Sequence, residues 1–465
     1  MSKDAIGEMA GLKMNKYVKR KIQTEIEKWI DRPEILAIRG PRQSGKSTLL
    51  EHIHLFLIKE KGIKKENIFY INFEDKSKQN NFSKDPDQYI KSFFNSNGEK
   101  YKDNNYHSDL NIAGKVEKKY YFMLDEYQYI KDGGSKLKFL YDSYKDVKFI
   151  ITGSSSLELT SKTIKYLVGR VFLFELYQFD FEEFLSTKEN NIYNYYKDIS
   201  GIVNNFVNLK PEKPKIEMDT IFGQELEKYF NEFCIYGGYP EAAISNNAEE
   251  KKIILENIFK TYIEKDIIDL LRLEDDLAFK NIVILLANRM ANILEYSGLM
   301  ADSSTYFKKL KNYLSILEET YIIYRLKPFF TNAASEIKKN PKIYFMDNGL
   351  RNTVINNYNL LEMRNDAGNL VENAVFTGLL KNKFSNIRYW RTINNAEVDF
   401  IYESQGKICP IEVKYSKMNK PYYGKSFYNF IKKYSPERGL ILTRGFWGIG
   451  KIDKSTILFA PAWFL

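Results

Sequence analysis

One stretch of eleven residues limits the fold of this chain more than any other. GPRQSGKSTLL, at 40–50, contains a glycine-rich turn followed by lysine and serine, in the pattern GxxxxGK[ST]. An apolar run, EILAIRG at 34–40, precedes the turn, and a helical pattern at 46–60 follows it. A buried strand, a phosphate-cradling loop and a helix in this order predict an α/β fold with a parallel sheet, whose ligand lies at the carboxyl ends of the strands.

The residue types in this loop indicate a nucleotide triphosphate as the ligand. Glycines let backbone N–H groups turn inward around the phosphates. We expect Lys46 to reach the β- and γ-phosphates of ATP and the Ser47 hydroxyl to hold Mg²⁺. The residues expected to bind the nucleotide here are Gly40, Pro41, Arg42, Gln43, Ser44, Gly45, Lys46, Ser47 and Thr48.

A second motif, YYFMLDEYQ at 120–128, is an apolar strand that ends in two acids. We expect Asp125 to hold Mg²⁺ through water and Glu126 to polarise the water that attacks ATP. The alternative is an edge strand that ends in solvated acids. Three more strands are predicted at 67–75, 147–156 and 170–179. The strand at 147–156 ends in the hydroxyls of Thr152, Ser154 and Ser155, which are placed to sense the γ-phosphate.

These motifs together resemble the AAA+ P-loop ATPases of archaea and bacteria that carry a characteristic C-terminal partner region. The resemblance is dense over residues 15–185, which we predict to be the ATPase domain, after a short polar extension at 1–14. It implies that Arg170, in the pair VGR before the last strand, contacts the γ-phosphate as an arginine finger. The alternative is a structural arginine that caps the strand or pairs with an acid.

The middle of the chain is predicted to be largely helical. Residues 186–215 are rich in Asn and Lys and are expected to be a polar linker or insertion, followed by a helical lid-like region at 216–275. That region contains YGGYPE at 236–241, a phrase shared with the resembled family, which indicates a sharp turn and leaves open a contact with nucleotide.

Residues 276–340 show helical spacing and then a β-rich segment, an order typical of a winged helix, and the family resemblance points the same way. Lys308, Lys309 and Lys311 lie on its last predicted helix and suit contact with DNA. The alternative is a domain-packing module with solvated lysines.

The last part of the chain carries a second group of charged residues. Glu372 lies near the start of a predicted helix at 368–384, and Asp399 lies on an alternating strand at 396–403. Glu412 and Lys414 are two residues apart on the next strand, so their side chains share one face. Carboxylates in this pattern predict a site for Mg²⁺, or for Mn²⁺, with Glu372, Asp399 and Glu412 as ligands and Lys414 beside the developing phosphate charge.

This E…D…ExK order resembles the PD-(D/E)xK region of restriction-endonuclease-like proteins, here with valine in place of the proline. The resemblance implies that residues 341–465 form an α/β nuclease-like domain in which Asp399, Glu412 and Lys414 are catalytic. Two alternatives stay open: a hairpin with an accidental charge pair, and a domain that keeps these residues for its fold and cuts nothing. Arg388 and Arg391 suit phosphate contacts, or are solvated charges at a strand end.

Composition narrows the class of protein without deciding its function. The chain has 465 residues, 44% apolar and 28% charged, with a net charge of +10, which favours polyanionic partners. No apolar run reaches the ~20 residues that span a bilayer. MSKDAIGEMAGLKMNK, at 1–16, lacks the apolar core of a signal peptide, so we expect none here. Cys234 and Cys409 form no disulfide or zinc pattern, so we expect a cytoplasmic protein. His52 and His54 are expected to be packing residues.

We therefore predict an ATP-hydrolysing protein coupled to DNA binding or to metal-dependent DNA cleavage. The alternative is a nucleotide-dependent switch or scaffold, in which the nuclease-like domain binds a partner without cutting. Membrane partners are not expected, and a homo-oligomer is left open.

Overall fold

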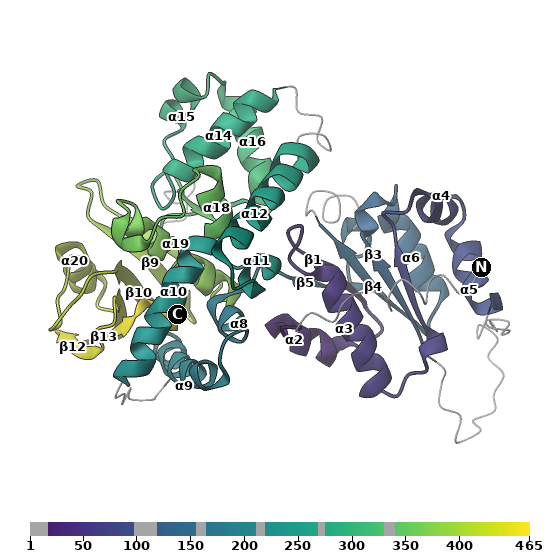
Figure 1. Ribbon diagram of the computed structural model, residues 1–465, viewed down its shortest axis with the longest axis horizontal. Coiled ribbons are helices and arrows are strands. Elements are labelled where there is room, and N and C mark those ends of the chain that lie inside the picture. Colours follow the sequence, from purple (N-terminus) through teal and green to yellow (C-terminus); the bar gives the residue numbers. More distant parts are fainter. Residues whose placement is uncertain (1–16, 97–118, 155–163, 211–218, 268–274, 330–339) are drawn as a thin grey trace. The chain divides into compact units, whose positions relative to one another are not determined.

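The computed structural model describes residues 17–96, 119–154, 164–210, 219–267, 275–329 and 340–465 (Figure 1). The chain divides into two compact units, Met1–Tyr177 and Gln178–Leu465. The first unit ends before the predicted domain end at residue 185, because the short helix α8 (Phe181–Leu185) belongs to the second unit. The predicted extension at 1–14 and Ser155 lie outside the described residues.

The first unit is built on a five-stranded sheet in the order β2-β3-β4-β1-β5, and every pairing in it is parallel. The predicted strands are confirmed as β1 (Ile35–Arg39), β2 (Ile68–Asn72), β3 (Tyr120–Asp125), β4 (Val147–Gly153) and β5 (Val171–Glu175). Helices cover both faces: α2 (Lys21–Trp29), α3 (Lys46–Lys59), α4 (Lys76–Lys84), α5 (Pro86–Ser96) and α6 (Gly133–Ser143).

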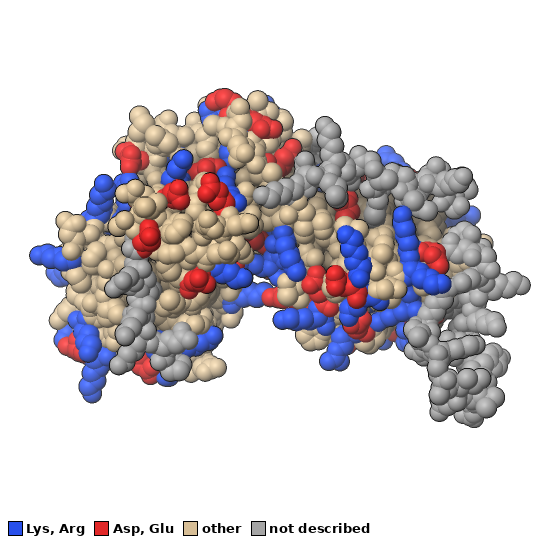
Figure 2. Space-filling view, turned by 60° about the horizontal axis from the view of Figure 1, so that its bottom comes forward, with Lys and Arg blue, Asp and Glu red and all other residues tan. Residues whose placement is uncertain are grey.

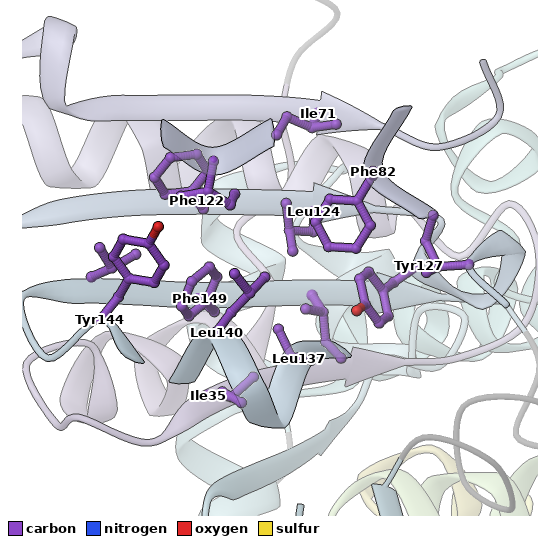
Figure 3. Close-up of a cluster of buried hydrophobic side chains, with 14 of the residues drawn as sticks. Ile35, Ile71, Phe82, Phe122, Leu124, Tyr127, Leu137, Leu140, Tyr144 and Phe149 are labelled. Atoms are coloured by element: carbon purple, nitrogen blue, oxygen red, sulfur yellow. The ribbon is translucent and has the colours of Figure 1, made fainter. Parts of the chain in front are cut away.

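Alternation along the strands separates two hydrophobic cores. On β3, Phe122 and Leu124 point into an aromatic cluster with side chains from α4, α5 and α6 (Figure 3). Tyr121 and Met123 point to the opposite face, where they pack with α2 and α3. Since β3 is buried on both faces, its sequence is continuously apolar up to Asp125. The acids are thus confined to the carboxyl end of the strand.

The second unit begins with helices and contains two sheets. Its helices before the first sheet are α8, α9 (Asn190–Val207), α10 (Thr220–Tyr236), α11 (Pro240–Ile244), α12 (Ala248–Ile258), α14 (Asp276–Asn288), α15 (Tyr296–Asp302) and α16 (Phe307–Glu319). A two-stranded antiparallel sheet follows, made of β6 (Ile323–Leu326) and β7 (Lys342–Phe345). Three helices and a two-stranded sheet are the elements expected of a winged helix, whose identity stays a prediction.

The six-stranded sheet of the second unit has the order β12-β13-β11-β10-β9-β8. Its strands are β8 (Ile387–Arg391), β9 (Glu397–Ser404), β10 (Lys407–Lys414), β11 (Arg438–Thr443), β12 (Gly448–Ile452) and β13 (Ser455–Pro461). Helices α18 (Asn348–Val354) and α19 (Ala367–Lys381) precede it, and α20 (Lys425–Tyr434) lies between β10 and β11 in the sequence. The predicted α/β character of this region is confirmed; a restriction-endonuclease-like identity is not tested by the fold.

The prediction of a linker at 186–215 is wrong for residues 190–207, which form the 18-residue helix α9. Ile192, Tyr196, Ile199, Val203 and Phe206 are all buried along one side of it. Their spacing is that of one helix face, so packing of this face outweighs the poor helix propensity of the intervening asparagines.

The YGGYPE phrase forms a tight turn between α10 and α11. The Asp347 carboxylate accepts a hydrogen bond from the Gly238 N–H at 2.7 Å and also caps α18 through the Leu350 N–H at 2.9 Å. A Cβ on Gly238 would lie 2.1 Å from the Phe179 carbonyl oxygen. The turn therefore has a structural reason for its glycines, as the sequence predicted.

We predict that Gly238→Ala lowers the free energy of unfolding by about 1–3 kcal/mol, because the added methyl displaces the backbone at Phe179. Gly201→Ala is the matched control: Gly201 lies inside α9 with no atom within 4 Å of its Cβ position. Helix propensity then stabilises this variant by roughly 0.5–1 kcal/mol. Urea unfolding measures both, and equal stabilities of the two variants would contradict the prediction.

Candidate active site and a buried charge cluster

The phosphate-binding loop connects β1 to α3 at the carboxyl edge of the parallel sheet. Gly45 precedes α3 with a φ of 92°, a left-handed conformation that glycine adopts without a Cβ penalty. Arg20 holds the loop by donating to the Ser44 carbonyl oxygen at 2.8 Å, and Arg42 donates to the Tyr129 hydroxyl at 2.9 Å. The predicted nucleotide-binding residues 40–48 are thus one continuous loop and the first turn of α3.

Asp125 connects this loop to the neighbouring strands. The Ser47 hydroxyl donates to Asp125 Oδ2 at 2.7 Å, and the Tyr70 hydroxyl donates to the same oxygen at 2.6 Å. The Thr152 hydroxyl donates to Oδ1. Ser47 and Asp125 are therefore adjacent, as the sequence predicted, and their oxygens are the hard ligands that Mg²⁺ prefers.

Glu126 follows Asp125 in a left-handed backbone conformation with a φ of 53°. Its side chain accepts a hydrogen bond from Gln128, and Gln128 also donates to the Ser154 hydroxyl at 2.9 Å. Glu126 and Ser154, which the sequence assigned to water activation and to γ-phosphate sensing, are thus joined through one amide. Positive φ is strained for a non-glycine residue, and such strain occurs frequently at functional sites.

Lys46 is buried, and its ammonium donates to the carbonyl oxygens of Gly40 at 3.1 Å and Pro41 at 2.8 Å. Burial lowers the pKa of Lys46 to about 8, although the carboxylates of Glu126 and Asp125 raise it. These carbonyl contacts hold the ammonium within the loop when no phosphate is bound.

Arg170 does not lie at this site. It precedes β5, and its carbonyl oxygen accepts from the Ile35 N–H at the start of β1, which is the sheet edge opposite to the phosphate loop. Its guanidinium pairs with Asp142 at 2.9 Å. Arg170 therefore lies away from the phosphate loop of its own chain and is paired with an acid, as the alternative described, while a role as an arginine finger stays a prediction.

Two residues of this site were not assigned from the sequence. Tyr70 lies inside a β2 pattern that gives no sign of its partner, because the contact depends on the pairing of β2 with β3. Gln128 belongs to the motif LDEYQ, so its position two residues after Glu126 was a usable signal.

The predicted acids of the C-terminal region also come together. Asp399 on β9 accepts from the Val413 N–H of β10 at 2.8 Å, and Glu412 pairs with Lys414 at 2.9 Å. Glu372 projects from α19 and accepts from the Tyr344 hydroxyl at 2.6 Å. We call Glu372, Asp399, Glu412 and Lys414, with Lys342 and Glu397 described next, the charge cluster.

The sequence analysis missed two members of the charge cluster, Glu397 and Lys342. Lys342 is the first residue of β7, and its side chain is only 2% exposed. Its ammonium lies 2.8 Å from Glu372 Oε1, 2.7 Å from Glu397 Oε1 and 3.9 Å from Asp399 Oδ1. A lysine between apolar residues of a short strand, as in PKIYF, was the only sequence signal for it.

Burial and mutual repulsion of the carboxylates favour protons in the charge cluster. Burial raises the pKa of Glu372 to about 7, with Asp399 adding to the shift and Lys342 opposing it. Burial and the Asp399 charge raise the pKa of Glu412 to about 8. Burial opposes the charge of Lys342, but the surrounding acids hold its pKa well above the usual range.

The predicted metal site at Glu372, Asp399 and Glu412 does not fit this arrangement. Within residues that the structure describes, no three His, Cys, Asp or Glu side chains are arranged to hold a metal ion. The Lys342 ammonium pairs with Glu372 and approaches Asp399, so two of the three proposed ligands already have a cation. The expected carboxylate repulsion, which was the reason to predict Mg²⁺ or Mn²⁺ here, is relieved by Lys342.

The arginines near the charge cluster are also paired. Arg388 lies 3.1 Å from Glu403, and Arg391 lies 2.9 Å from Glu397. Both guanidinium groups are thus paired with acids of β9 rather than only solvated, and their contact with phosphate stays a prediction.

Three family models match successive parts of the chain. Residues 32–185 match the family model described as an AAA domain. Residues 227–360 and 367–462 match two models described as domains of unknown function, DUF8612 and DUF4143. The parallel sheet, the phosphate loop and the first of these matches make the N-terminal part an AAA-type P-loop ATPase domain.

Two curated relatives extend over both units. An uncharacterized protein of Haemophilus influenzae is 24% identical over 93% of this chain and 94% of its own length. The uncharacterized protein MJ1544 of Methanocaldococcus jannaschii is 25% identical over 88% of this chain and 82% of its own. Among solved structures, the Walker-type ATPase PABY2304 of Pyrococcus abyssi has 15% identity and a TM-score of 0.42, covering 73% of this chain and 96% of that chain.

Membrane-spanning helices were sought across the described ranges. None of the helices there has both the length and the apolar character needed to cross a bilayer.

We predict that ATP affinity falls as the pH rises through about 8, the pKa of Lys46. Only the protonated ammonium attracts the phosphates, and below this pH it is already charged, so the loss begins above it. Calorimetric titration of ATP between pH 7 and pH 9.5 measures the slope.

The control for this prediction is Lys46→Arg, whose guanidinium stays charged over the whole range. A flat pH profile in the wild type, or an equal slope in the arginine variant, would contradict the assignment to Lys46.

Proposed function

We propose that this protein hydrolyses ATP at the loop of residues 40–48 and uses the nucleotide state to control a partner that binds the second unit. The observation that carries the proposal is the contact of Ser47 with Asp125, 2.7 Å apart, at the end of the sheet where Glu126 follows. Loop, hydroxyl, aspartate and glutamate are the groups that ATP hydrolysis requires, and they lie together.

In the proposed reaction, Lys46 leaves the Gly40 and Pro41 carbonyls and binds the phosphates. Mg²⁺, held through Ser47 and Asp125, neutralises phosphate charge when bound. Glu126 accepts the proton of a water molecule as its oxygen attacks the γ-phosphorus, and ADP leaves with the electron pair of the broken P–O bond. Gln128 positions Glu126 relative to Ser154, so both respond to the same phosphate.

We predict that Glu126→Gln keeps ATP binding and slows hydrolysis by at least about two orders of magnitude, the scale of losing a positioned general base. Asp142→Asn is the matched control, since it makes the same kind of change in an acid at the opposite sheet edge. Phosphate release under saturating ATP measures the rate. Wild-type turnover in Glu126→Gln would place water activation elsewhere.

For the C-terminal domain we favour binding without cutting over metal-dependent cleavage of DNA. Lys342 supports this choice, because it supplies the positive charge that the acids would otherwise take from a metal ion. The proposed function is thus a nucleotide-dependent switch, with the AAA-type domain as its enzyme and the second unit as its binding part.

We propose DNA as the partner, on the evidence of charge. The chain carries +10, and Lys308 and Lys311 are exposed on α16. Lys309 is already paired with Asp275 at 2.7 Å, which reduces its share. On the face drawn in Figure 2, basic side chains alternate with acidic ones over both units. That face has no continuous basic patch, so the proposal rests on the exposed lysines of α16, which would contact phosphates without reading the bases.

We predict that DNA affinity falls steeply, by roughly 10³ or more, between about 50 and 200 mM salt for six phosphate contacts. Replacing Lys308, Lys309 and Lys311 by alanine weakens binding and reduces the salt slope. The matched control replaces Lys76, Lys78 and Lys84 on α4, which removes the same charge from the first unit. Fluorescence anisotropy with labelled DNA measures both; equal losses in the two triple variants would remove α16 from the interface.

A further inference from the structure

Lys342 occupies a position in the charge cluster that a free cation would favour. It reaches the cluster from β7, outside the six-stranded sheet, while Glu397 and Asp399 come from β9 and Glu372 from α19. Three carboxylates from two elements therefore share one ammonium, at 2.8, 2.7 and 3.9 Å. Buried carboxylates at such distances need a positive charge between them, whatever its chemical source.

Glu412 provides an independent sign that the cluster has room for a further interaction. The residue is 4% exposed, and its Oε1 pairs with Lys414. Its Oε2 is buried and has no hydrogen-bond partner among the residues that the structure describes. A buried carboxylate oxygen without a partner is costly, and the negative charge of Asp399 acts on it as well.

We propose that Lys342 is an internal cation that fills this carboxylate cluster in place of a divalent metal ion, and that removing its charge turns the cluster into a divalent-cation site formed by Glu372, Asp399 and Glu412. The ammonium has three N–H donors and a single charge. It pairs with Glu372 and Glu397 but leaves Glu412 Oε2 without a hydrogen-bond partner. This is expected when a singly charged group takes the place of a doubly charged ion.

The proposal deepens the function suggested for the C-terminal domain, and rests on it only for the claim that the domain does not cut. Where a lysine ammonium neutralises the carboxylates of the cluster, no metal ion is bound there to activate water. β7 pairs with β6 and lies within the DUF8612 match at 227–360, so Lys342 reaches the cluster from outside the DUF4143 match at 367–462.

The test uses the full-length, nucleotide-free protein and Mn²⁺ as the probe. Lys342→Met removes the charge and keeps most of the side-chain volume. We expect this variant to lose about 10 °C of melting temperature without metal, since it leaves buried acids without their partner. Millimolar Mn²⁺ should restore about half of the loss, and electron paramagnetic resonance should count one Mn²⁺ more than in the wild type.

Two further variants test whether the additional Mn²⁺ ion is bound by the charge cluster. In Lys342→Met combined with Asp399→Asn, the additional Mn²⁺ should disappear, because one ligand charge is gone. Lys407→Met is the matched control, since Lys407 pairs with Glu437 on the protein surface and is 53% exposed. It should behave as the wild type. Mn²⁺ bound near Ser47 and Asp125 is common to all four proteins and cancels in the comparison.

Two results would overturn the proposal. One is Mn²⁺ binding to the wild type that Asp399→Asn removes, which would mean that the metal enters despite Lys342. The other is a folded Lys342→Met that binds no additional Mn²⁺, which would make Lys342 a structural counter-ion only. If the methionine variant does not fold, Lys342→Gln replaces it under the same criterion. Plasmid cleavage, measured separately on the wild type, tests the binding-only function.

Discussion

The first unit depends on a buried carboxylate at the end of β3, between β2 and β4. Asp125 is fully buried and accepts hydrogen bonds from Ser47 of α3, Tyr70 of β2 and Thr152 of β4. A buried charge without such donors would be strongly destabilising, so these contacts fix the loop, the helix and two neighbouring strands relative to one another. These contacts hold Ser47 and Asp125, the two groups proposed to bind Mg²⁺, in fixed positions relative to each other.

The second unit also stabilises a buried charge, but there the charge is positive. There a buried ammonium is surrounded by acids, whereas in the first unit a buried carboxylate is surrounded by hydroxyl donors. The difference has a functional consequence. The hydroxyl groups that donate to Asp125 are neutral, whereas Lys342 pairs with Glu372 and Glu397 through its ammonium. The proposal of a metal ion at Asp125 and of none at the charge cluster follows from this difference.

Much of the fold followed from local patterns in the sequence. The five strands of the first unit, the ATP loop and the placement of Asp125 and Glu126 depend on short apolar runs that end in polar residues. Asp399 and Glu412 were also grouped correctly, because strand alternation places their side chains, whereas Glu372 joins them from α19. Lys342 was missed because β7 pairs with β6, so only tertiary packing brings it to the cluster. The pairing of Arg170 with Asp142 depends in the same way on tertiary packing, here of α6, and its motif gives no sign of it.

Helix α9 shows how composition can hide a pattern that is present. Its asparagines and lysine suggested a loop, yet its buried residues recur at helical spacing from Ile192 to Phe206.

The overall charge of the chain must likewise be read together with the position of each charged residue. Basic residues in this chain number 70 against 60 acidic ones, but many described lysines and arginines form ion pairs, and the most deeply buried of these pairs have structural roles. Only lysines that keep their charge exposed, such as Lys308 and Lys311, contribute to attraction of a polyanion over a Debye length. The net charge therefore indicates a class of partner, whereas the placement of each charge decides which residues take part in binding and which hold the protein together.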